Sequence, residues 1–139
     1  MEVDESKVRL LMKEFRYAEG IASAFVRWDG RCAYCGEDLL ASRPGYSSAG
    51  IDHLIPKSHL EQPNCSDLVD SPANIVLCCS SCNNMKYTMD ALEGHDAREV
   101  LLDPERRESF IKNVRCNLRD RIRARESEWH RVSCIVRGD

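Results

Sequence analysis

At 139 residues the chain has the size of a single domain, and its formal net charge at pH 7 is only −3. No apolar run approaches the ~18 residues that a membrane-spanning helix needs, and the charged residues 1–7 do not resemble a secretory signal. These properties exclude a membrane-spanning protein and indicate a cytoplasmic one.

The first half of the chain predicts one helix followed by short β-elements. Apolar side chains recur at steps of three and four over residues 4–28, which predicts a helix that ends at Asp29 and Gly30. Residues 31–40 are expected to form a short hairpin, and residues 41–49, rich in Ser, Gly and Pro, a loop. A strand is predicted over residues 51–55 and is stopped by Pro56. Residues 57–72 are polar and predict irregular structure.

The second half predicts a short strand and two helices. Residues 74–78 are apolar, and a helix is expected to start near residue 80. Asp103, Pro104 and Glu105 form a strong start signal for a long helix. Its apolar stripe consists of Ile111, Val114, Leu118 and Ile122. We therefore expect one α+β domain in three parts: residues 1–30 (N-terminal helix), 31–90 (core) and 91–139 (C-terminal helical extension).

The spacing of the cysteines predicts a metal site. Eight cysteines could indicate a disulfide framework, but that framework belongs to secreted proteins. Cys32 and Cys35 form one CxxC pair, and Cys79 and Cys82 form another. Two such pairs suit a tetrahedral Zn²⁺, and four cysteine ligands leave no open position, so the zinc is expected to be structural.

The other four cysteines have no pairing pattern. Cys78 could also reach a metal, but only Cys79 has the two-residue spacing to Cys82. Cys65, Cys116 and Cys134 are interpreted as ordinary thiols. The alternative in which the CxxC pairs are merely buried thiols is disfavoured, because two matched pairs by chance are improbable.

Five polar residues near the cysteine pairs could carry out phosphodiester hydrolysis: Asp52, His53, Asn74, Asn83 and Lys86. This reaction needs a base for water and a divalent ion on the phosphate oxygens. Histidine is the natural base near pH 7, and carboxylate and amide oxygens suit Mg²⁺. Asn83 and Lys86 lie three apart on the expected helix and share a face, where the lysine could meet a phosphate.

Together these segments resemble a known family. The strings CAYCG, IDHLIPKS and SPANIVLCCSSCNNMK, within residues 31–88, are similar to the zinc-containing branch of the HNH endonucleases. The resemblance implies a ββα-metal core with structural zinc, here flanked by an N-terminal helix and a long C-terminal helix. It also implies a nuclease that cuts DNA, most commonly in restriction or phage defence.

The resemblance also implies a role for each site residue. His53 would activate water, Asp52 and Asn83 would hold a catalytic Mg²⁺ or Mn²⁺, and Asn74 would orient the histidine. Lys86 matches the CNxxK ending of the family's motif. The third position of the motif is Asn83 rather than histidine, a variant that the family also uses. His59 is an alternative that could assist His53 or substitute for it.

The C-terminal segment is basic, unlike the core. Residues 103–139 contain ten basic and seven acidic side chains, whereas residues 31–102 contain five and ten. Six of the basic residues form two rows along the long helix: Lys112, Arg115, Arg119 and Arg123 in one, and Arg121 and Arg125 in the other. They could bind double-stranded DNA or simply form a solvated helix face. Because the core is acidic, a protein partner that supplies targeting is a further hypothesis.

Two other functions compete with an independent nuclease. The first is a zinc-finger-like module that binds nucleic acid without cutting it. The second is a regulatory or toxin-like subunit that cuts only inside a larger complex. The complete set of Asp52, His53, Asn74 and Asn83 favours the nuclease, because a pure binding module would not need it.

Overall fold

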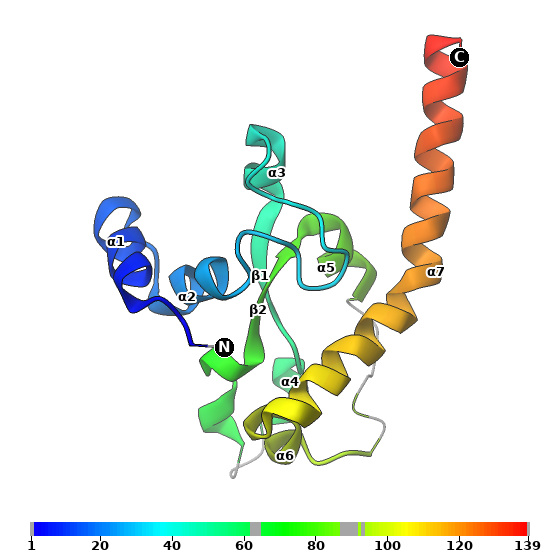
Figure 1. Cartoon of the computed structure of the whole chain (residues 1–139). Helices are drawn as coiled ribbons and strands as arrows, with labels where there is room; N and C mark the ends of the chain where they lie inside the picture. Colours follow the sequence, from blue (N-terminus) through cyan, green and yellow to red (C-terminus); the bar gives the residue numbers. More distant parts are fainter. Residues whose placement is uncertain (1, 62–64, 87–91, 93, 139) are drawn as a thin grey trace.

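A computed structural model describes residues 2–61, 65–86, 92 and 94–138 of the chain. The helices and strands are α1 (Glu5–Phe15), α2 (Glu19–Arg27), α3 (Arg43–Ser48), β1 (Ala49–His53), α4 (Lys57–Leu60), β2 (Ile75–Cys79), α5 (Ser80–Lys86), α6 (Ala97–Leu102) and α7 (Pro104–Arg137). Two short 3₁₀ helices, η1 (Ser66–Leu68) and η2 (Pro72–Asn74), precede β2. Figure 1 shows β1 and β2 at the centre, with α1 and α2 on one side and α5 and α7 on the other.

The centre of the fold is a two-stranded antiparallel sheet. Ala49 pairs with Cys79 at one end of β1 and β2, and His53 pairs with Ile75 at the other. β2 leads directly into α5, which packs against both strands. The result is the ββα arrangement expected from the sequence, so the α+β fold class is confirmed.

The long C-terminal helix begins where the sequence predicted. The Asp103 side chain accepts hydrogen bonds from the backbone amides of Glu105 and Arg106, which caps α7. The stripe of Ile111, Val114 and Leu118 is buried in the core. Beyond Ile122 the helix extends away from the other elements (Figure 1), and its large apolar side chains there are exposed: Trp129, Val132, Ile135 and Val136.

The prediction of a single N-terminal helix is wrong, because two helices, α1 and α2, are present. Arg16 ends α1 in the left-handed region with φ 56°, and Ala18 starts α2 in an extended conformation. Both helices keep apolar residues at helical spacing, so periodicity alone did not reveal the break. The break turns the chain so that α2 lies along the sheet while α1 packs on α2.

Several short elements also differ from expectation. The hairpin of residues 31–40 is reduced to one bridge between Arg31 and Asp38. The expected loop of residues 41–49 contains α3, because Ser42 caps it through the amide of Gly45 and Pro44 suits its first turn. β1 starts at Ala49, and the segment expected to be irregular contains α4 and η1. Part of that segment, residues 62–64, and the expected boundary at residues 90 and 91 lie outside the described residues.

Candidate active site and metal centre

The four paired cysteines converge on one point. Cys32 and Cys35 lie in the turn after α2, Cys79 ends β2, and Cys82 is in the first turn of α5. Their Sγ atoms all lie within 4.8 Å of one another, and the Sγ atoms of Cys35 and Cys79 are 3.9 Å apart. A tetrahedral zinc with Zn–S bonds of about 2.3 Å requires sulfurs about 3.8 Å apart. The cluster therefore fits a zinc ion.

Local backbone structure shapes the first cysteine turn. The amide of Gly36 donates to the carbonyl of Cys32 at 2.9 Å, and the amide of Cys32 donates to the carbonyl of Glu37 at 2.9 Å. Gly36 has a φ of 77°, a conformation that glycine adopts without steric cost. This tight turn directs both sulfurs of the pair to the same side.

Hydrogen bonds to sulfur favour the thiolate form that a metal needs. The backbone amides of Cys79 and Cys82 donate to the Sγ atoms of Cys32 and Cys79, each at 3.4 Å. Hydrogen bonds from the Cys35, Cys79 and Cys82 side chains lower the pKa of Cys32 far below its ordinary value. The same sulfur–sulfur contacts raise the pKa of Cys35 and of Cys82, so without a metal the negative charge is favoured on Cys32 and not on all four sulfurs. A bound zinc would favour the thiolate form of each ligand.

Cys78 is not part of the cluster. It pairs with Gly50 in the sheet and is buried, and this burial raises the pKa of its thiol. The choice of Cys79 over Cys78 as the candidate ligand is therefore confirmed. Cys65 is also a buried free thiol, and Cys116 and Cys134 are exposed on α7.

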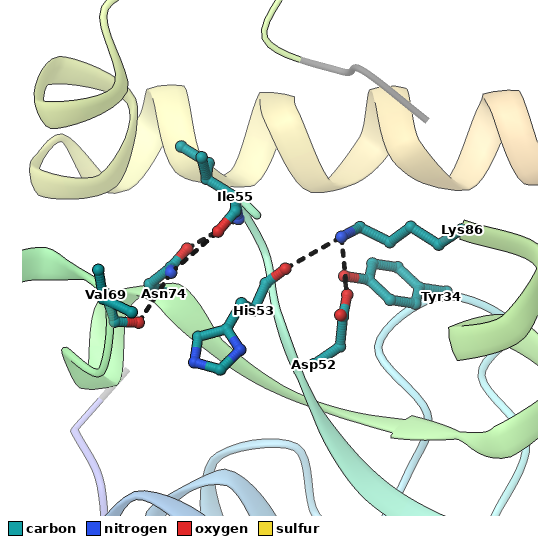
Figure 2. Close-up of polar contacts among 7 residues, drawn as sticks. All are labelled: Tyr34, Asp52, His53, Ile55, Val69, Asn74 and Lys86. Atoms are coloured by element: carbon teal, nitrogen blue, oxygen red, sulfur yellow. Dashed lines mark hydrogen bonds and ion pairs between the residues drawn. The ribbon is translucent and has the colours of Figure 1, made fainter. Parts of the chain in front are cut away.

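Asp52 lies near the opposite end of β1 and is held by two donors (Figure 2). Its Oδ2 accepts a hydrogen bond from the Tyr34 hydroxyl at 2.7 Å and lies 2.8 Å from Nζ of Lys86. Burial, followed by the charge of Asp52, raises the pKa of Tyr34, so this hydroxyl remains a donor. Among the described residues no hydrogen bond or ion pair reaches Oδ1 of Asp52. One oxygen of the carboxylate is therefore left for another ligand.

Lys86 ties the end of α5 to the end of β1. Its side chain is only 5% exposed, and Nζ also donates to the carbonyl oxygen of His53 at 3.0 Å (Figure 2). The same ammonium lies 5.8 Å from the centre of the Tyr34 ring. The sequence suggested that Lys86 contacts a phosphate. In the structure its ammonium is instead buried and contacts Asp52 and the carbonyl of His53 inside the protein.

His53 is the last residue of β1, and its side chain is 34% exposed. Adjacent residues inside a strand normally point to opposite faces, so residues 52 and 53 could serve one site only where the strand twists, bulges or ends, and β1 ends at His53. Its Nε2 lies 2.9 Å from Oδ1 of Asp70, in the link between η1 and η2. Sequence reasoning missed Asp70, because an acid in a polar segment gives no local signal of such a contact.

Asn74 is fully buried and acts as a clamp (Figure 2). Its Oδ1 accepts from the amide of Ile55 at 2.8 Å, and its Nδ2 donates to the carbonyls of Ile55 at 3.1 Å and Val69 at 3.0 Å. Its backbone carbonyl accepts from the amide of Leu54 at 2.7 Å. These bonds fix the backbone directly after His53, and they do so without touching the imidazole.

The remaining candidates lie around these groups. Asn83 is exposed in α5, one turn before Lys86, and its side chain makes no hydrogen bond to the other described residues. The structure therefore does not place it in contact with Asp52 or His53. His59 is half-buried in α4.

The six basic residues of α7 that were expected to bind DNA differ in what their side chains contact. Nε of Arg115 donates to the carbonyl of Ala33 at 2.6 Å, inside the first cysteine turn, and Arg121 donates to the carbonyl of Met85 in α5. Arg125 pairs with Glu128 at 3.0 Å. Lys112, Arg119 and Arg123 are exposed. Two members of the expected DNA-binding stripe therefore hold α7 against the metal-binding core.

Comparisons with known proteins agree with this geometry. Residues 32–88 match the family model described as HNH endonuclease. Neither the curated proteins nor the solved structures gave a match. Within the described part of the chain, no helix combines the length and the apolar character needed to cross a membrane.

The segment that matches the family model begins at Cys32 and contains the whole cysteine cluster as well as Asp52, His53 and Asn74. Residues 32–88 are therefore similar to the HNH endonuclease family, and four cysteines within them are placed to bind a metal ion.

Proposed function

We propose that this protein is a metal-dependent endonuclease that hydrolyses phosphodiester bonds of double-stranded DNA. The observation that carries the proposal is the half-exposed imidazole of His53 at the end of β1, in a segment of an HNH family domain. Beside it, Asp52 keeps one oxygen without a partner among the described residues. A base and a carboxylate oxygen are the two groups that water activation and metal binding need.

In this proposal His53 removes a proton from the attacking water. Asp52, through Oδ1, and Asn83, through its side-chain oxygen, are the residues that would hold Mg²⁺ or Mn²⁺. When bound, the ion would polarise the phosphate and stabilise the charge that develops on its oxygens. The donor set is sparse, with one charged and one neutral oxygen, so most coordination positions are left to water and phosphate.

Lys86 weakens that metal site when DNA is absent. Its ammonium lies 2.8 Å from Oδ2 of Asp52 and partly neutralises the carboxylate. A divalent cation at Oδ1 would be repelled by this nearby positive charge. We therefore expect weak Mg²⁺ binding to the free protein and stronger binding when the phosphates of DNA supply further negative charge.

The zinc has a separate, structural role in this proposal. Four sulfur ligands complete its coordination and leave no position for water or substrate. The zinc would hold together the first cysteine turn, the end of β2 and the start of α5. The cysteine turn carries Tyr34, α5 carries Lys86, and β2 pairs with β1, the strand that carries Asp52.

A second candidate function is a zinc-stabilised module that binds nucleic acid, or regulates a larger nuclease, without cutting by itself. The ion pair between Lys86 and Asp52 favours it, because this pair already satisfies one carboxylate oxygen without a metal. A protein partner could then supply the targeting. A role as the nuclease subunit of a restriction or defence system belongs to the first candidate and rests on family analogy alone.

The test is cleavage of supercoiled plasmid by the zinc-loaded full chain, with and without Mg²⁺ or Mn²⁺. We expect His53→Ala to remain folded and to lose roughly 10²–10⁴ in rate, because it lacks the general base. His130→Ala is the matched control, since it removes an exposed histidine from α7. A folded His53→Ala protein that cuts at the wild-type rate would remove His53 from the mechanism. A wild-type protein that binds plasmid but never cuts it would support the second candidate.

A further inference from the structure

The contact between His53 and Asp70 joins two parts of the chain that the HNH motif does not connect. Asp70 lies in the link between η1 and η2, and its side chain is 85% exposed. Its Oδ1 nevertheless lies 2.9 Å from Nε2 of His53, which is hydrogen-bonding distance. An exposed acid has many other orientations available to it, so a specific contact to the candidate base needs a reason.

The chemistry of the two groups fixes where the proton lies. An ionised carboxylate can only accept a hydrogen bond, so Nε2 of His53 must carry the hydrogen. In a neutral imidazole the other nitrogen, Nδ1, then keeps its lone pair and can accept a proton. We propose that Asp70 is a positioning residue that holds His53 in the tautomer with Nδ1 as the base. This inference rests on the proposed nuclease function.

The buried Asn74 sets the distance between the two partners. Its amide binds Ile55, two residues after His53, and Val69, the residue before Asp70. Leu68 and Val69 are buried, which anchors the link on the core side. Arg27 of α2 donates to the carbonyl of Pro72 and braces the far end of the link. The backbone on both sides of the contact is therefore held by the same buried side chain.

An exposed carboxylate in this role has a cost and a benefit. Because solvent screens it, it stabilises the imidazole less than a buried partner would. It also lies on the surface that approaches a negatively charged substrate. Removal of Asp70 would therefore eliminate both its hydrogen bond to His53 and its repulsion of the phosphates, and the cleavage rate measures which effect is larger.

The experiment compares variants of the zinc-loaded full chain in plasmid cleavage at saturating Mg²⁺. Asp70→Asn can offer its amide N–H to Nε2 and so favour the wrong tautomer, as happens when the aspartate of a serine-protease triad becomes asparagine. We expect kcat to fall roughly tenfold to a hundredfold with little change in KM. Asp70→Glu should recover most of the rate. Asp67→Asn is the control, because it removes a similar exposed acid that pairs with Arg98 instead, at 2.7 Å.

A double variant separates positioning from other effects of charge. In a His53→Ala background, Asp70→Asn should cause no further loss of rate, because the residue acts only through the histidine. NMR of ¹⁵N-labelled histidine gives a readout that needs no activity. The wild-type protein should show His53 with its hydrogen on Nε2, and Asp70→Asn should shift the tautomer balance toward Nδ1–H.

The outcomes distinguish this inference from the proposed function. If the wild type cuts and His53→Ala does not, while Asp70→Asn matches Asp67→Asn, the positioning role is wrong and the nuclease function stands. An Asp70→Asn protein whose His53 tautomer is unchanged contradicts it as well. If the wild type does not cut, the proposed function fails, and the tautomer measurement still decides whether Asp70 directs the imidazole.

Discussion

The two ends of the same small sheet carry opposite kinds of site. At one end Cys79 pairs with Ala49, and four sulfurs converge within 4.8 Å of one another. At the other end His53 pairs with Ile75, and nitrogen and oxygen groups surround a half-exposed imidazole. The first end is chemically closed, because four sulfur ligands would complete the coordination of a zinc ion. The second is open, because no described residue occupies one oxygen of Asp52 or one nitrogen of His53.

The difference lies in what holds each end in place. In the proposed account, the cysteine end depends on a zinc ion that the four sulfurs would bind. The histidine end depends on side chains that the chain already contains: Asn74 clamps the backbone, and Lys86 joins α5 to β1. We infer that loss of zinc affects the whole fold, whereas changes at the histidine end are more local. The following variants test that separation, from the largest expected effect to the smallest.

Removal of zinc should have the largest effect. Binding of a structural zinc contributes on the order of 10 kcal/mol to folding, which is comparable to the total stability of a typical domain. Chelation, or Cys82→Ser, should therefore abolish cooperative unfolding in calorimetry, and added zinc should restore it only in the chelated wild type. Cys116→Ser removes an exposed thiol and should change nothing. Cooperative unfolding that survives complete zinc removal would contradict the structural role.

Asn74→Ala should be the most destabilising change at the histidine end. It leaves the amide and carbonyl of Ile55 and the carbonyl of Val69 without their partner, in a fully buried place. We expect a loss of about 3 kcal/mol in the free energy of unfolding. Urea denaturation of the zinc-loaded protein measures it, with the exposed Asn117→Ala on α7 as the control. A loss below about 1 kcal/mol would show that Asn74 is not the clamp described.

Lys86→Met should have an intermediate effect. The change removes an almost buried ammonium and leaves Oδ2 of Asp52 with only the Tyr34 hydroxyl. We expect a loss of about 2 kcal/mol in urea denaturation, and about 1 kcal/mol for Tyr34→Phe, which removes a single hydrogen bond. Lys86→Met should also strengthen Mg²⁺ binding, because it removes the positive charge of the ammonium beside Asp52. A Lys86→Met protein that binds Mg²⁺ more weakly would assign Lys86 a supporting role at the metal.

The arginines of α7 should show the smallest effects, and of two kinds. Arg115→Ala removes the hydrogen bond to Ala33 and should cost about 1 kcal/mol of stability. Arg123 is exposed, so Arg123→Ala should leave stability unchanged. If the helix binds DNA, Arg123→Ala should reduce the salt dependence of binding by about one phosphate contact. Equal effects of the two variants on stability would contradict the division of this helix into bracing and exposed arginines.

Much of the cysteine end could be predicted from sequence because its signal is local. Two CxxC spacings identify all four candidate ligands without any knowledge of how the chain folds, and the structure confirms that they converge. The start of α7 was also predictable, since Asp103 and Pro104 act within one turn of the helix. Signals that depend only on residues close together along the chain can be recognised in a single sequence.

The histidine end was only partly predictable, because its contacts join distant residues. The pairing of Lys86 with Asp52 and of Asp70 with His53 depends on the fold, and neither pair has a characteristic spacing. The break between α1 and α2 was missed for a related reason. Arg16 adopts a left-handed conformation that its residue type does not favour, so only the packing of the two helices reveals it.

The central claim is that the two ends hold different ions for different purposes, and one measurement tests it directly. The protein is treated with EDTA only long enough to remove weakly bound Mg²⁺, and elemental analysis verifies that one zinc per chain remains. Plasmid cleavage is then followed against Mg²⁺ concentration. We predict no cleavage without Mg²⁺, recovery as Mg²⁺ or Mn²⁺ is added, and no full recovery in Asp52→Ala at any concentration. Cleavage at the full rate by zinc-retaining, magnesium-free protein would contradict the account.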